Sequence, residues 1–176
     1  LKVNVRHGEL KFANVVYDLK ADLSHSKFVA IGVDGSSTSI DASYTVVIVD
    51  DWNEGELKLN YVEVAELASV ETLILTANSS NIHIEDLKSD ALIDGSFGKL
   101  SVKSIDDLFN SLNVILENSD AVINLPNTDY DLLFNGNRSK FNNESTTKKL
   151  IKNYPEGGSS DRTIVVNAKY SNVVMQ

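Results

Sequence analysis

Aromatic and imidazole side chains recur at one position of this sequence, with a spacing that would place them in one column. The first seven members are 17 to 21 residues apart and an eighth follows later: His7, His25, Tyr44, Tyr61, Ser79, Phe97, Asn118 and Tyr170. Flat rings on an exposed face can stack on sugar rings, so Tyr44, Tyr61 and Phe97 are the candidate ligand-binding residues, for a glycan or a protein. The same rings could instead stack only on one another, since cross-strand aromatic pairs stabilise a sheet by about 0.2 to 1 kcal/mol.

Two groups of side chains could bind metal ions, although neither has a complete ligand set. His7 and His25 lack the cysteine or placed carboxylate that usually completes a zinc site. Asp50, Asp51 and Glu54 offer the carboxylate oxygens that Ca²⁺ prefers, without the spacing of an EF-hand loop. We therefore expect a solvated acidic loop there, with a calcium site as the lesser alternative, and no cofactor.

Carboxylates are numerous enough that a glycosidase pair could be imagined at almost any separation, so their abundance identifies no active site. A polysaccharide lyase is the sharper enzyme alternative, because such enzymes cluster Asp with Lys or Arg. Only Arg6 and Arg138 precede residue 162, and neither shares a column with an acidic cluster. No phosphate-binding loop, dinucleotide motif, nucleophile elbow or zinc motif occurs.

These side chains can share a column only if the chain coils with a fixed period, and the hydrophobic pattern has one. Each repeat is apolar at positions 1, 3 and 5, small at 8, and apolar at 10 and 12, which indicates two short strands joined by a corner. Seven repeats start at residues 1, 19, 38, 55, 73, 91 and 112, and an eighth starts at 164. Position 15 is also apolar in most repeats, which indicates a third, shorter wall: Val15, Val33, Trp52, Leu87 and Ile105.

One such repeat cannot bury its own apolar side chains, whereas repeats stacked about 4.8 Å apart enclose a continuous core. We therefore predict an all-β fold: a single-stranded parallel β-helix, or solenoid, of about eight rungs with a repeat of about 18 residues, right-handed. A rung is one turn of the coil. Eight side chains should be almost fully buried: Leu75, Ile82, Ile84, Ile93, Leu100, Val102, Val114 and Leu116.

Two other solenoids fit the sequence less well. A left-handed helix of hexapeptides needs an aliphatic residue every six positions, and the column of polar and aromatic residues at position 7 breaks that rule. Leucine-rich repeats have a longer period and a helical segment in each turn, and neither recurs here.

The repeats predict a single domain over residues 1–176, with contiguous rungs at 1–123, a loop or hairpin excursion at 124–163 and a final rung at 164–176. Residues 132–134 should form a strand, and Asn135-Gly136 should turn the chain back towards Phe141. We expect this excursion to cover the end of the coil, and residues 164–175 to pair beside 112–123. At the other end Leu1 starts in register, so end-to-end self-association through unpaired strand edges is expected.

Composition narrows the functional classes. The 176 residues contain 16 Lys and Arg against 25 Asp and Glu, a net charge of −9, which disfavours nucleic acid as a partner. The absence of cysteine excludes disulfides, thiolate metal sites and a cysteine nucleophile. No apolar run approaches the roughly 18 residues of a membrane span, and a start at Leu1 rather than Met suggests a processed chain.

Three tracts resemble a known family: residues 19–26 (LKADLSHS), 93–100 (IDGSFGKL) and 168–173 (AKYSNV). They are similar to rungs of the DUF4097/DUF2807 group, the adhesin-type "head GIN" β-helix proteins, over nearly the whole chain. The resemblance implies a bacterial cell-envelope protein that is exported to the periplasm, the outer membrane or the cell surface. It carries over no catalytic residues. Val62 in place of a small residue and Glu66 at an inward position depart from the pattern and put the geometry of the fourth rung in question.

The sequence thus leads to a non-catalytic structural or adhesion-type module of the cell envelope, with a glycan or protein bound on the solenoid face. A carbohydrate-active β-helix enzyme, a lyase or a hydrolase, is the alternative. Exposed aromatic residues beside a groove would favour the first, and converging carboxylates with a base in a pocket would favour the second.

Overall fold

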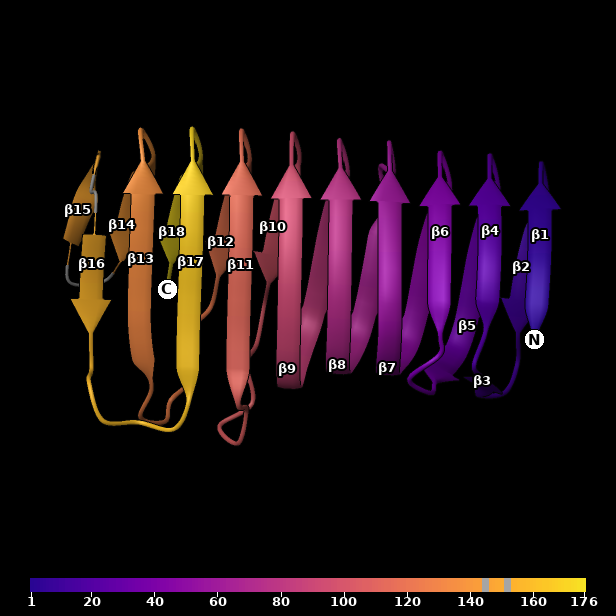
Figure 1. The fold of residues 1–176 in the computed structure, drawn as a ribbon, viewed down its shortest axis with the longest axis horizontal. Coiled ribbons are helices and arrows are strands. Elements are labelled where there is room, and N and C mark those ends of the chain that lie inside the picture. Colours follow the sequence, from indigo (N-terminus) through magenta and orange to yellow (C-terminus); the bar gives the residue numbers. More distant parts are fainter. Residues whose placement is uncertain (144–145, 151–152) are drawn as a thin grey trace.

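The structure is a computed structural model that describes residues 1–143, 146–150 and 153–176, and in these ranges it is a β-solenoid without helices (Figure 1). Its strands coil as one continuous sheet and pair in parallel from rung to rung except at one end. Their bounds are β1 (Lys2–Arg6), β2 (Glu9–Phe12), β3 (Val16–Tyr17), β4 (Lys20–Ser24), β5 (Lys27–Asp34), β6 (Ser39–Ser43), β7 (Val46–Asn60), β8 (Ala65–Asn78), β9 (Asn81–Ser96), β10 (Lys99–Val102), β11 (Ser111–Glu117), β12 (Asp120–Ile123), β13 (Asp131–Asn137), β14 (Lys140–Asn143), β15 (Thr146–Leu150), β16 (Asn153–Glu156), β17 (Thr163–Lys169) and β18 (Asn172–Met175).

Each rung has two long walls and a third, shorter one. The first wall contains β1, β4, β6, the second halves of β7, β8 and β9, then β11, and the second wall contains β2, the first part of β5, the first parts of β7, β8 and β9, then β10 and β12. In the middle rungs the chain turns through the third wall without leaving β structure, so β7, β8 and β9 are 15, 14 and 16 residues long. The repeat of about 18 residues is confirmed by this register.

The core is a set of apolar columns inside the coil, because alternate side chains of each strand point inward. All eight residues predicted to be buried are at most 5 % exposed. The third wall adds Val33, Trp52, Leu87 and Ile105 to this core, as predicted. Its member in the first rung is Val16, which pairs with Val33, and not Val15, which is exposed.

The fourth rung differs from the predicted register by one residue. Ala65 and Leu67 face the core and pair with Val47 and Val49, while Val64 and Glu66 face solvent. The corner after Tyr61 therefore contains one extra residue, which moves every later side chain of that strand to the opposite face. This shift removes the inward-facing Glu66 that the repeat template implied.

The last rungs do not follow the order of the sequence. As predicted, the final segment pairs beside the seventh rung: β17 lies against β11 and β18 against β12. The predicted Asn-Gly hairpin is wrong, because Gly136 lies inside β13, and β13 and β14 are the two walls of a further rung on the far side of β17 and β18. Seven consecutive rungs are thus followed in space by the rung of residues 163–175 and then by that of residues 131–143.

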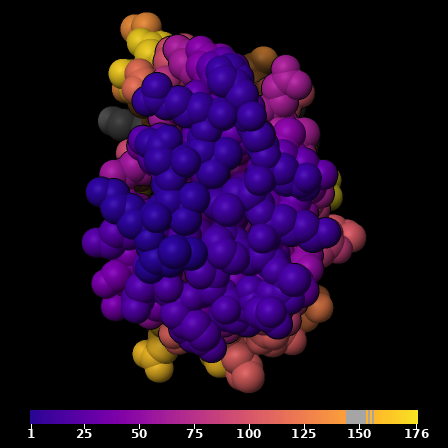
Figure 2. All heavy atoms as spheres, turned by 90° about the vertical axis from the view of Figure 1, so that its right-hand side faces the viewer, coloured from indigo at the N-terminus to yellow at the C-terminus, as the bar shows by residue number. Residues whose placement is uncertain are grey.

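The two ends of the coil are finished differently. At the C-terminal end, β15 runs antiparallel to β14 and β16 antiparallel to β13, and together they cover its last edge (Figure 1). Leu132, Phe134 and Phe141 are buried under this end, although Leu133 is exposed. At the N-terminal end, which faces the viewer in Figure 2, the inward side chains are only half-buried: Val3, Val5, Leu10, Phe12 and Val16.

Candidate functional site

The corner between the first and second walls positions every candidate aromatic side chain. The corner column consists, in spatial order, of His7, His25, Tyr44, Tyr61, Ser79, Phe97, Asn118, Tyr170 and Arg138. All nine have a left-handed backbone, with φ between 49° and 57°. The peptide N–H of each of the first eight donates to a carbonyl of the next rung, so the corners are joined along the axis. The left-handed turn directs each side chain out of the coil.

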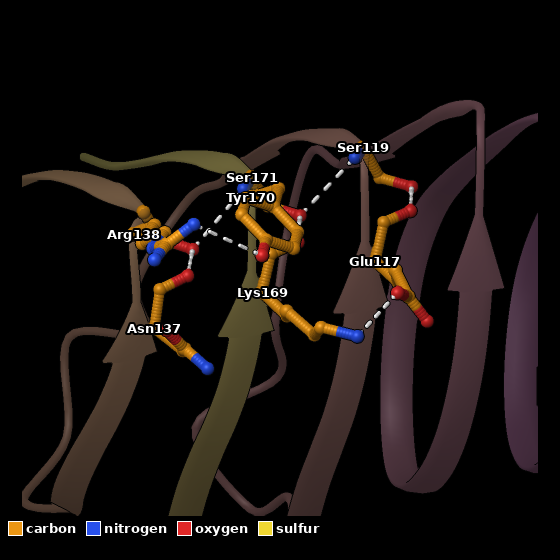
Figure 3. Close-up of polar contacts among 8 residues, drawn as sticks. Glu117, Ser119, Asn137, Arg138, Lys169, Tyr170 and Ser171 are labelled. Atoms are coloured by element: carbon orange, nitrogen blue, oxygen red, sulfur yellow. Dashed lines mark hydrogen bonds and ion pairs between the residues drawn. The ribbon is translucent and has the colours of Figure 1, made fainter.

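In several rungs the residue directly after the corner-column residue is a serine whose buried hydroxyl group forms hydrogen bonds at the corner. The Ser119 N–H donates to the hydroxyl oxygen of Ser171 (3.1 Å), and that hydroxyl donates to the Lys169 carbonyl (2.9 Å), as Figure 3 shows. The Ser171 N–H donates in turn to Ser139. Because these polar groups are buried, each would be costly without its partner. The backbone that carries the corner column is therefore held by buried hydrogen bonds between rungs.

Four rings of the corner column form a continuous stack. Centroid distances are 5.1 Å for His7 and His25, 4.9 Å for His25 and Tyr44, and 5.1 Å for Tyr44 and Tyr61, whose planes differ by only 8°. These four rings therefore stack on one another, as the alternative to sugar binding predicted. Tyr44 has a ring on each face and offers a ligand mainly its edge, whereas Tyr61 has a ring on one face only.

Phe97, the third candidate, lies apart from that stack. Ser79 occupies the rung between Tyr61 and Phe97, and Asn118 occupies the rung between Phe97 and Tyr170. Tyr44, Tyr61 and Phe97 are all exposed, at 53 %, 50 % and 61 %. The structure therefore brings Tyr44 and Tyr61 into contact. Phe97 is separated from the nearest aromatic ring by one rung on each side.

A groove of about 620 Å³ opens around the gap at Asn118, between Phe97 and Tyr170. Its walls include the adjacent column of the second wall, where Lys99, Asp120, Asn172 and Lys140 follow one another from rung to rung. Arg138 closes the far end: its guanidinium lies 5.7 Å from the centre of the Tyr170 ring and donates to the Tyr170 hydroxyl (3.4 Å). The site thus combines two exposed rings with polar groups of both signs.

The groove is locally cationic on an acidic protein. Lys99, Lys140 and Arg138 line it against one carboxylate, Asp120, and within the described part of the chain none of these four has an ion-pair partner within 4.0 Å. The ammonium of Lys169 lies 5.5 Å from the centre of the Tyr170 ring. It is paired with Glu117 (2.7 Å), and this hydrogen bond raises the pKa of Lys169 (Figure 3). The groove therefore holds a surplus of positive charge that is available to a ligand.

The carboxylates proposed for calcium lie elsewhere. Asp50, Asp51 and Glu54 are exposed along β7, on the way through the third wall. Among the described residues, no three His, Cys, Asp or Glu side chains gather in a group that could hold a metal ion. His7 and His25 meet as stacked rings.

Other charged clusters lie on the outer faces and link neighbouring rungs. Hydrogen bonds from Lys103 and then His83 lower the pKa of Glu85, and a hydrogen bond to Asp86 raises the pKa of Lys88. Burial raises the pKa of Asp90, but hydrogen bonds from Ser111, Asn110 and Ser89 outweigh this and lower it. Exposed pairs of this type contribute about 0 to 1 kcal/mol each, so they adjust the stacking of rungs slightly.

Comparison with protein-family models, with curated proteins and with solved structures gave no match. Within the described ranges no helix is long and apolar enough to span a membrane.

The groove itself is not predicted by the sequence pattern. Arg138 joins the corner column because residues 132–143 follow the repeat template, with Leu132, Phe134 and Phe141 inward and Ser139 at the small position. That signal was present, but Gly136 and Asn143 at apolar positions and the Asn-Gly dipeptide favoured a hairpin. Lys99 and Lys140 could not be placed along one groove from the sequence, because the rung of Lys140 stacks on the far side of the rung of residues 163–175.

Proposed function

We propose that this chain is a non-catalytic, adhesion-type module of the cell envelope, which binds a glycan along the corner column. The observation that supports it most is the groove in the corner column, where exposed rings stand at fixed intervals beside hydrogen-bonding side chains. Carbohydrate sites need this combination, since a sugar ring has apolar faces and a polar rim. A stiff coil presents such a site without a cost in ordering loops.

The location in the cell envelope rests on the resemblance of the three rung tracts to the head GIN β-helix group. Fractionation of cells that naturally produce the protein, followed by immunodetection, tests it. Recovery with the periplasmic, outer-membrane or surface fraction is the expected result, and recovery in the cytosolic fraction would contradict it.

The alternative function, a carbohydrate-active enzyme, would require a different set of side chains in the same groove. A glycosidase of the usual kind requires two carboxyl groups about 5 to 9.5 Å apart across the scissile bond. Among the described residues that line the groove, Asp120 is the one carboxylate. This composition favours binding over hydrolysis.

Retention on immobilised polysaccharides tests the binding function. We expect the chain to be retained by at least one member of a panel of neutral and acidic polysaccharides, and the double variant Tyr61→Ala/Phe97→Ala to be retained at least about tenfold more weakly. Leu108→Ala is the matched control, because Leu108 is an exposed apolar side chain away from the corner column. Equal retention of the double variant, or release of new sugar ends from the bound polysaccharide, would overturn the proposal.

A further inference from the structure

The gap at Asn118 has the thickness of one ring. Rings on adjacent rungs of the corner column lie 4.9 to 5.1 Å apart. Phe97 and Tyr170 are two rungs apart, which corresponds to about 9.6 Å at the usual strand spacing. One further ring placed between them would therefore continue the spacing of the stack on both sides.

Asn118 leaves this space open while supplying polar groups at its base. Its short side chain is exposed, and its left-handed backbone (φ 50°) directs it outward between the two rings. Asn tolerates this backbone better than most residues, and its amide both donates and accepts hydrogen bonds. A ring that enters the gap can therefore form hydrogen bonds with the Asn118 amide at its base.

The charges beside the gap favour a particular class of ligand. On the second wall Asp120 lies in the rung of Asn118 and Lys99 in the rung of Phe97. Lys140 and Arg138 lie in the rung beyond Tyr170, at the far end of the same groove. An anionic group on the ligand would be attracted by this surplus of positive charge. Asp120 can accept hydrogen bonds from sugar hydroxyls, and its charge opposes a ligand that carries many sulfate groups.

Resting on the glycan-binding function proposed above, we propose that the gap between Phe97 and Tyr170 binds a carboxylate-bearing pyranose, a uronic acid unit of an acidic polysaccharide. Phe97 and Tyr170 enclose the faces of the sugar, Asn118 and Asp120 bind its hydroxyls, and Lys99 binds its carboxylate. Lys140 and Arg138, beyond Tyr170, attract the acidic unit that follows along the polysaccharide. The gap at Ser79, between Tyr61 and Phe97, also borders Lys99, which pairs with Asn81 of its rung, but it lies away from Lys140 and Arg138. It is therefore the internal comparison for the proposal.

Calorimetric titration with trigalacturonate, and with its methyl ester as the uncharged ligand of the same ring, tests the inference. The acid should bind at least about tenfold more tightly than the ester, and salt should weaken only the acid. Equal affinity for the two ligands, or no binding of either, would overturn the preference for a uronic acid.

The site itself is tested by filling the gap. Asn118→Tyr should place a ring between Phe97 and Tyr170 and abolish binding of trigalacturonate without lowering the midpoint of thermal unfolding. Ser79→Tyr is the matched control, because it fills the other gap and should leave the affinity unchanged. Undiminished binding by Asn118→Tyr would overturn this site. If the Tyr61→Ala/Phe97→Ala variant still lost retention on another polysaccharide, the glycan-binding function would stand while the uronic acid site fell.

Discussion

At the scale of the residue, the corners of the coil depend on positions that ordinary residues occupy reluctantly. A left-handed backbone costs a non-glycine L-residue about 1 to 2 kcal/mol, and nine residues of the corner column adopt it. In each of the first eight corners this conformation is held by a peptide hydrogen bond to the next rung, and in four of them by a stacked ring as well. The outward rings are therefore consequences of the corner geometry as much as candidates for ligand binding.

Gly98, directly after Phe97, is the corner residue whose replacement we expect to be most damaging. A Cβ atom added at Gly98 would lie 1.9 Å from the Ser80 carbonyl oxygen, a backbone atom that accepts the Lys99 N–H. Gly98→Ala should therefore lower the free energy of unfolding by about 1 to 3 kcal/mol, the usual effect of forcing extra volume into a packed site. Urea unfolding followed by circular dichroism measures this.

Gly8 occupies the same repeat position in the first rung and is the matched control. Its nearest contact for an added Cβ is the Val5 side chain at 3.5 Å, an ordinary distance. Gly8→Ala should leave the unfolding midpoint within error. If the two substitutions had equal effects, the close approach of the rungs at Gly98 would not be a feature of the folded protein.

At the scale of the element, a strand of this coil buries its inward side chains fully only when a rung lies on each side of it. Leu100 in β10 lies between Ile82 and Ala121 of the neighbouring rungs and is 3 % exposed. Leu10 occupies the same repeat position in β2 but is covered by Phe28 on one side only. Position along the axis, rather than residue type, thus decides how much apolar surface each leucine buries.

This difference predicts unequal effects of the same substitution. Leu100→Ala should lower the free energy of unfolding by about 2 to 5 kcal/mol, because the stacked walls cannot collapse into the space. Leu10→Ala should have a clearly smaller effect, since the Leu10 side chain is only half-buried. Urea midpoints of the two variants provide the test, and equal losses would contradict one continuous core through both positions.

At the scale of the whole molecule, the coil is asymmetric in how it ends. The antiparallel strands β15 and β16 cover the C-terminal edge, while β1, β2 and β3 have strand partners on one side only among the described residues. An unpaired strand edge is a template for another strand, which is the basis of the end-to-end self-association expected from the sequence. That expected self-association remains a prediction.

Exposing a second edge should make association stronger. Deletion of residues 128–160 removes the rung of 131–143 and its cover, yet leaves six residues between β12 and β17. Connections between other rungs range from four residues (68–71) to eight (103–110). Light scattering should then give a larger mass than for the intact chain at the same concentration.

A charge on the new edge strand provides the control for that deletion. Adding Val165→Lys, on the outer face of β17, should reduce the association because lysines on edge strands oppose pairing. A deletion variant that stayed monomeric and as stable as the intact chain would show that residues 128–160 do not protect the coil.

The period of the sequence by itself determined the repeat, the two long walls, the buried columns and the shared corner position of Tyr44, Tyr61 and Phe97. It could do so because each of these depends on neighbours one repeat away, and alternation of apolar residues records which face is buried. Even the pairing of residues 164–175 with 112–123 followed from that rule. These contacts are periodic, so a local pattern was sufficient to predict them.

Only the tertiary structure decided where the rung of residues 131–143 lies and what it contributes. Because that rung stacks on β17 and β18, Arg138 comes to lie beside Tyr170, and Lys140 lines the same groove as Lys99. No period contains this information, because an apolar edge accepts any strand that fits its columns, whatever the intervening length of chain. The aromatic residues were therefore predictable from the sequence, whereas the groove between them depends on the order in which the last rungs stack.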